Sequence, residues 1–219
     1  MTSIVPTPFL FRYSLPVHKV KTLPKRAKTS LLGLPESCSL PNLREVDGAN
    51  QFADVRVAWN DKGFGISALV SGRTMPLACD SKRPAESDGL QVWIDTRNTQ
   101  NIHRASRFCH HFCFLPARKN GKPEKPIASQ IEIARSRDKT NPVDAKSLSV
   151  NVVAKRGGYL LEAWMPANVL NGYDPEASPR LGFYYLVRDS ELGEQYLTVD
   201  DKFPFASDPS VWSTLELSS

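Results

Sequence analysis

Apolar and polar residues alternate with a period of two along most of this chain. In residues 54–60, Val55, Val57 and Trp59 alternate with more polar neighbours, and an Asn-Asp-Lys-Gly turn at 60–63 leads into 64–70. This pattern predicts a β-hairpin, and it predicts that Trp59 packs in the core because it shares a face with Val55 and Val57. The same period predicts further strands at 9–16, 89–95, 108–115, 130–135, 147–154, 159–165, 181–188, 195–198 and 212–217. The single helical signal lies at 166–170, where Pro166 suits a first helical turn.

Many short strands with almost no helix predict an all-β fold. We expect an antiparallel two-sheet β-sandwich, jelly-roll-like, with at most one or two short helices. The chain has 219 residues, of which 41% are hydrophobic, and this is enough for one core. We therefore expect a single domain over residues 1–219, in which residues 1–39 form a basic N-terminal strand and linker segment.

Several strands direct aromatic and polar residues to the face opposite the core. In 89–95 the apolar alternate positions belong to the core, which leaves Gln91 and Trp93 on the other face. Flat rings combined with amides, carboxylates and arginine suit sugars, whose C–H faces stack on rings while their hydroxyls need donors and acceptors. An alternative is that the N-terminal segment covers the tryptophans, which then only enlarge the core. The outward positions, and candidate carbohydrate-binding residues, are Trp93, Trp164, Gln91, Glu162, Tyr184 and Arg188.

Five strand motifs resemble, in order and spacing, those of family 9 carbohydrate-binding modules. The similarity covers residues 40–219 and implies a β-sandwich that binds glycans without cleaving them, in a slot between tryptophans. Such modules accompany glycoside hydrolases and often hold structural calcium, for which Asp95 and Asp189 at strand ends are candidates. The tryptophans of the slot would be Trp93 and Trp164. The motifs are DVRVAWNDKGFGISALVSG (54–72), SDGLQVWIDTRN (87–98), GGYLLEAWMPANVL (157–170), PRLGFYYLVRD (179–189) and DPSVWSTLEL (208–217).

A histidine and cysteine cluster lies in residues 101–116. Read as a strand from 108, this stretch puts Cys109, His111 and Cys113 on one face, and His103 in the preceding loop completes a tetrahedral Cys/His set. The spacing matches no established zinc motif, so we expect no bound metal or other cofactor. A metal site here is an alternative, and haem is another, because related sandwiches bind haem through Met and His. A third alternative is an interaction scaffold without a sugar site.

Charge and motif content narrow the function classes further. Lys plus Arg is 28 and Asp plus Glu is 23, and seven basic residues between Arg97 and Lys125 are accompanied by one acid. Such a region would suit an anionic sugar or phosphorylated ligand, and a solvated basic loop is the commoner explanation. Nucleic-acid binding is not expected, because no recognition helix or zinc-finger spacing occurs. No apolar run approaches the ~20 residues of a membrane span, and no secretory signal is recognised, so a cytoplasmic location is expected. No Gly-x-Ser-x-Gly, P-loop or dinucleotide motif indicates an enzyme.

Overall fold

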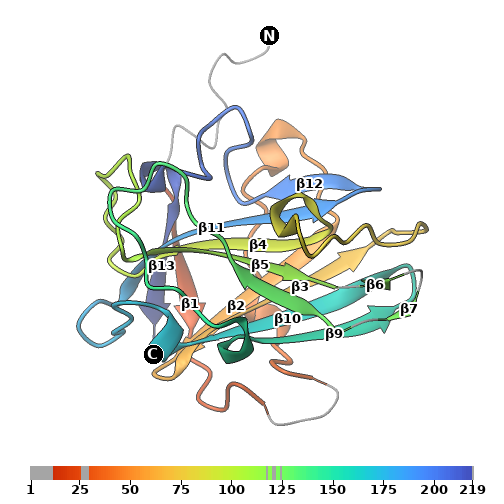
Figure 1. Ribbon diagram of the computed structural model, residues 1–219, viewed down its shortest axis with the longest axis horizontal. Coiled ribbons are helices and arrows are strands. Elements are labelled where there is room, and N and C mark those ends of the chain that lie inside the picture. The colour runs from red at the N-terminus through yellow and green to blue at the C-terminus, as the bar shows by residue number, and fades with distance from the viewer. Residues whose placement is uncertain (1–11, 26–29, 117, 120–121, 124, 219) are drawn as a thin grey trace.

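Two β-sheets pack face to face in the computed structural model, which describes residues 12–25, 30–116, 118–119, 122–123 and 125–218 (Figure 1). The four-stranded sheet has the order β2-β3-β10-β9, from Ala53–Asn60, Gly63–Ser71, Gly158–Pro166 and Ser149–Lys155. The seven-stranded sheet has the order β1-β13-β11-β4-β5-β8, and β12 pairs with β11. Its strands are Ser14–His18, Ser213–Ser218, Arg180–Asp189, Gly89–Asp95, Cys109–Leu115, Ile127–Gln130 and, for β12, Gly193–Tyr196. A short ladder joins β6 (Arg118–Lys119) to β7 (Lys122–Pro123).

The predicted two-sheet β-sandwich is confirmed, with two local differences. β1 runs parallel to β13, whereas the other pairs are antiparallel. Residues 9–11 of the strand predicted at 9–16 lie outside the described residues. The strand predicted at 130–135 is wrong, because the sheet strand is β8 and ends at Gln130. Ile131 N still donates to the His111 carbonyl of β5 at 2.8 Å, and the chain then leaves the sheet. The apolar period there reflects Ile133, which is buried in the core cluster from a loop.

Helical structure in the described residues is limited to three-residue 3-10 turns. The helix predicted at 166–170 is one of these, at Ala167–Val169. In the described part of the chain no helix is long and apolar enough to cross a membrane. The other turns are η2 (Glu36–Cys38), η3 (Glu45–Asp47), η4 (Pro84–Glu86), η5 (Ala145–Ser147) and η7 (Pro209–Val211).

The core lies between the inner faces of the two sheets. Phe64 and Leu161 from one sheet and Phe112 and Phe183 from the other are each fully buried. Trp59 shares the inner face with Val55 and Val57, and its Nε1 donates a hydrogen bond of 2.9 Å to the Val17 carbonyl. Its predicted place in the core is confirmed.

An N-terminal strap crosses the outer face of the four-stranded sheet. The strap comprises residues 20–40, of which 26–29 lie outside the described residues. It begins where Val20 N donates to the Trp59 carbonyl at 2.9 Å and ends where Leu40 N donates to the Val55 carbonyl at 2.8 Å. Its buried residues Leu23, Leu32, Leu34 and Cys38 form a second apolar cluster with Ala58 and Trp164.

Candidate functional site

Three of the predicted binding residues lie together on the outer face of the seven-stranded sheet. Tyr184 of β11 is directly opposite Trp93 of β4, and Trp93 is directly opposite His111 of β5. Gln91 is two residues along β4 on the same face. The predicted outward direction of Gln91, Trp93 and Tyr184 therefore agrees with the register of these strands.

This face is covered by the chain itself. Trp93 is 1% exposed and Tyr184 is fully buried. The Phe205 ring, from the segment before β13, contacts both, with centroids 5.4 Å from Trp93 and 4.7 Å from Tyr184. The Tyr184 hydroxyl donates to the Val199 carbonyl. The expectation that Trp93 offers an open stacking surface is therefore wrong, because residues 199–205 occupy it.

Trp164 and Glu162 lie on the other sheet, so the six candidates do not share one face. Both belong to β10, and Trp164 is 2% exposed beneath the strap. Glu162 accepts hydrogen bonds from the N–H groups of Leu31, Leu32 and Gly33 at 2.7–3.1 Å, from Ser30 Oγ at 3.0 Å and from Asn151 Nδ2 at 2.9 Å. Burial raises the pKa of Glu162, but these hydrogen bonds outweigh it and hold the pKa below its usual value. Glu162 thus binds the strap as a carboxylate, and the covered-tryptophan alternative holds for Trp164.

Arg188 and the candidate calcium ligands are engaged with the protein. Arg188 pairs with Glu194 at 2.6 Å, with about a third of each side chain exposed. Asp95 accepts hydrogen bonds from the backbone N–H groups of Arg97 and Thr99. Asp189 accepts hydrogen bonds from the backbone N–H groups of Glu191 and Leu192, and it also pairs with the buried guanidinium of Arg73. These carboxylates already have N–H donors where a cation would sit.

The histidine and cysteine cluster is not gathered around one point. His103 lies on an exposed loop, whereas Cys109, His111 and Cys113 follow β5 beneath covering segments. Within the described ranges, no group of three or more His, Cys, Asp or Glu side chains is placed to hold a metal ion. For the haem alternative, Met165 is in the core and Met75 is 64% exposed.

A cavity of about 350 Å³ opens onto β5 beside the covered face. His111 is one of its lining residues and is stacked on Trp93 with ring centroids 4.1 Å apart. Gln91 Nε2 donates to the Ala85 carbonyl at 2.9 Å, which directs its Oε1 toward His111 Nε2, 3.1 Å away. Because Oε1 can only accept, Nε2 carries the proton. Burial lowers the pKa of His111 to about 3, so the ring is neutral and Nδ1 keeps its lone pair.

The rest of this cavity, named the His111 cavity, combines apolar walls with a few polar groups. In the described residues the His111 ring is hydrogen-bonded at Nε2, to Gln91 Oε1 at 3.1 Å and to Cys113 Sγ at 3.6 Å. Lys139 and Glu132 pair at 3.3 Å at the exposed mouth. The cavity is lined by Ala105, Cys109, His111, Gln130, Ile131, Glu132, Ile133, Ser136, Lys139, Thr140 and Pro142.

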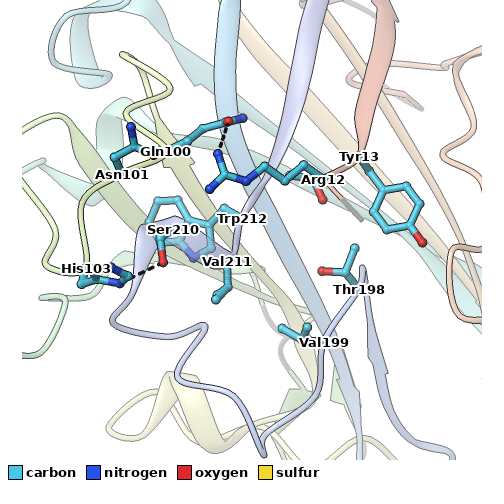
Figure 2. A pocket seen from close by; sticks show the side chains of 11 residues that line it. Arg12, Tyr13, Gln100, Asn101, His103, Thr198, Val199, Ser210, Val211 and Trp212 are labelled. Carbon is cyan, nitrogen blue, oxygen red and sulfur yellow. Dashed lines mark hydrogen bonds between the residues drawn. The ribbon is translucent and has the colours of Figure 1, made fainter. Parts of the chain in front are cut away.

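A second concave region, the end hollow, lies where Arg12 and Tyr13 meet the loop between β4 and β5 and the residues leading into β13 (Figure 2). It consists of two adjoining pockets, of about 420 and 690 Å³, that share Arg12, Tyr13, Gln100 and Asn101. Figure 2 shows Arg12 directed at Gln100, to which its Nη1 donates at 3.0 Å.

Ser210, His103 and Asp208 lie close together at this hollow but do not form a nucleophile with its base. His103 Nδ1 is 3.1 Å from Ser210 Oγ and 3.0 Å from Asp208 Oδ2, so one ring nitrogen meets both partners. A hydrolytic triad needs the two opposite nitrogens for these roles. Ser210 Oγ also donates to Asp208 Oδ1 at 2.6 Å. The trio therefore fixes the turn at Pro209–Val211.

Comparison with known proteins gives matches in structure and none in sequence. No family model matches the chain, and no curated protein matches its sequence. A family 9 carbohydrate-binding module from Caldicellulosiruptor kristjanssonii, in complex with cellotriose, is 12% identical with a TM-score of 0.62, covering 94% of each chain. The chain has the fold of this module. The same kind of module in complex with glucose gives a TM-score of 0.60, with 12% identity over 94% of this chain and 96% of that one.

A third structure supports the same fold. It comes from Bacteroides uniformis, is described as a candidate carbohydrate-binding protein, and is 12% identical with a TM-score of 0.53 over 95% of this chain and all of that one. The structural resemblance to family 9 modules inferred from the strand motifs is thus confirmed. At this identity the likeness shows the fold.

Of the residues that line the end hollow, sequence reasoning singled out Arg97, in a basic stretch, and His103, in the Cys/His set, and missed the others. Arg12 and Gln100 are far apart in the chain, and neither carries a motif. The one available signal was Asp208 followed by Pro209, a pattern of short-helix N-caps, and Asp208 does accept from Ser210 N at 2.9 Å.

Proposed function

We propose that this protein is a non-catalytic carbohydrate-binding protein and that the sugar site is the His111 cavity. The observation that carries this proposal is a neutral histidine, His111, in the lining of a cavity of about 350 Å³, with its Nε2 already engaged by Gln91, which leaves Nδ1 as the acceptor that we assign to the ligand. A cavity of this size, mostly apolar with few oriented polar groups, is typical of small-molecule sites. A buried acceptor selects a ligand that brings a hydroxyl donor, because an acceptor left unmatched by an apolar ligand costs binding free energy.

The fold adds support. The neighbours from Caldicellulosiruptor are described in complex with cellotriose and with glucose. In this chain the tryptophans of the sheet faces are buried, so we place the sugar against the Ile131 and Ile133 side chains and the His111 ring edge. Lys139 and Glu132 balance each other at the mouth, and a neutral saccharide suits such a site.

Calorimetric titration with glucose, xylose and cellotriose tests this proposal. Ser136 is half-buried in the cavity wall, and Ser136→Phe would fill the cavity. His111→Phe keeps a ring on Trp93 but removes the acceptor. We expect His111→Phe to weaken saccharide binding roughly tenfold, the equivalent of about one hydrogen bond, and Ser136→Phe to abolish it because the new ring occupies the cavity. His18→Phe is the matched control, because His18 is an exposed histidine at the end of β1 that does not line the cavity.

Two results would contradict the proposal in different ways. Binding that survives Ser136→Phe and His111→Phe would place the sugar elsewhere. If no saccharide binds the unaltered protein, the interaction scaffold becomes the better hypothesis. In that case the aromatic and polar residues of the two outer sheet faces would serve only to bind the strap and residues 199–205.

A further inference from the structure

The end hollow carries an excess of positive charge. Three arginines line its larger pocket, Arg12, Arg97 and Arg180, and Glu216 is the acid that lines it. Arg180 and Glu216 are 3.5 Å apart, and both are largely exposed. In the described residues Arg97 lies over the Phe108 ring, 5.0 Å from its centroid, rather than against a carboxylate. An oxyanion entering this pocket would meet guanidinium groups that can each donate two parallel hydrogen bonds.

Hydrogen bonds fix the floor of the hollow before any ligand arrives. Arg12 donates to Gln100 Oε1, and Gln100 Nε2 donates to Thr214 Oγ1. Thr214 in turn donates to Asn98 Oδ1 at 3.1 Å. In this series of hydrogen bonds the side-chain oxygens of Gln100, Thr214 and Asn98 each act as an acceptor. The Asn98 amide nitrogen is left as a donor, with no partner in the described part of the chain.

The loop that presents Arg97 and Asn98 is also held in place. Asp95, which is 1% exposed, accepts from Arg97 N at 3.0 Å and from Thr99 N at 2.6 Å. Asn98 takes a left-handed backbone conformation with φ of 48°, which asparagine tolerates better than most residues. A loop fixed in this way loses little conformational freedom when a ligand binds.

We propose that the end hollow is a binding site for an acidic saccharide. Its carboxylate lies among Arg12, Arg97 and Arg180, and its hydroxyl oxygens accept from the amide nitrogens of Asn98 and Asn101. The excess of arginine distinguishes this hollow from the His111 cavity, where Lys139 is paired with Glu132. The proposal does not rest on the His111 cavity, and either site can exist without the other.

Titration with tetragalacturonate and with its fully methyl-esterified form tests the proposal, because the two share one sugar chain and esterification replaces each carboxylate with an uncharged methyl ester. We expect the acid to bind at least roughly tenfold more tightly than the ester, since a charge-assisted hydrogen bond is the stronger kind. Arg97→Gln and Arg12→Gln should each weaken binding of the acid by roughly fivefold to tenfold. Arg137→Gln is the matched control, because Arg137 is an exposed arginine paired with Asp138 outside the hollow.

Three results would overturn the proposal. The first is equal binding of acid and ester, and the second is equal binding by the hollow variants and Arg137→Gln. The third is full competition by inorganic sulfate with no advantage for the saccharide, which would leave a simple anion site. Ser136→Phe should leave tetragalacturonate binding unchanged. Loss of glucose binding with retention of acid binding would separate this proposal from the neutral-sugar proposal.

Discussion

Replacing Glu162 with glutamine should release the N-terminal strap while leaving the sandwich folded. Glu162 is 1% exposed, and its Oε1 accepts three hydrogen bonds and its Oε2 two. A glutamine can supply one oxygen. If that oxygen takes the three-donor position, the Leu31 N–H and the Asn151 amide lose their acceptor. At ~1.5–3 kcal/mol for each hydrogen bond to a charged group, strap docking should weaken by about 3–6 kcal/mol.

Hydrogen exchange measures this loss directly. We expect the amides of Leu31, Leu32 and Gly33 to exchange at least ~100-fold faster in Glu162→Gln, which corresponds to ~3 kcal/mol. Trp164 fluorescence should shift to the red as water reaches the ring. Glu86→Gln is the control, because Glu86 is exposed and pairs with Arg83 far from the strap. Unchanged protection of the strap amides in Glu162→Gln would refute the assignment of Glu162 as its anchor.

Three other predictions follow from the buried groups. Trp93→Ala should lower the free energy of unfolding in urea by ~3–5 kcal/mol, because the ring is packed on all sides, and a loss below ~1 kcal/mol would indicate an exposed ring. Burial lowers the pKa of His110 to about 4 and of His111 to about 3, so the unfolded chain binds protons that the folded protein does not. The contribution of each neutral histidine to the free energy of unfolding should be complete above about pH 6.5 and should fall by ~1.4 kcal/mol per pH unit down to about pH 4. Urea titrations at pH 7 and pH 5 measure this fall. The fall should be half as large in His111→Gln, because one of the two histidines is then missing. Arg73→Met should cost ~3–5 kcal/mol by thermal unfolding, because it leaves the buried Asp88 and Asp189 without their partner, and a neutral effect would contradict that pairing.

The directions of the side chains on each strand could be predicted from the sequence. A strand has two faces, so three apolar alternate residues in β4 left Gln91 and Trp93 only one place to point. Trp59 was assigned to the core by the same argument, from Val55 and Val57 on its face. The sheet to which a strand belongs could not be predicted in this way, because β4 and β10 alternate alike and only long-range pairing separates them.

The period-two pattern also could not predict which segments cover the outer faces of the two sheets. Phe205 reaches Trp93 from more than one hundred residues away in sequence, in a segment without regular strands. Leu32 reaches Trp164 from the other end of the chain, where Gly65 on the sheet leaves room for it, because a Cβ there would lie 3.1 Å from a Leu32 methyl group. Such contacts are set by packing between distant segments, which local periodicity does not encode.

The sequence pattern that suggested a sugar site has a second physical meaning in this protein. Sugars need hydrogen-bonding groups beside a flat apolar surface, and an irregular peptide segment needs the same, because its N–H and C=O groups must be satisfied when it is buried. Glu162 accepts three strap N–H groups beside Trp164, and Tyr184 donates to the Val199 carbonyl beside Trp93. Both outer faces therefore bind segments of their own chain. The two sites that we propose lie outside these coverings: the His111 cavity is at the edge of one of them, and the end hollow is where the loop between β4 and β5 meets Arg12.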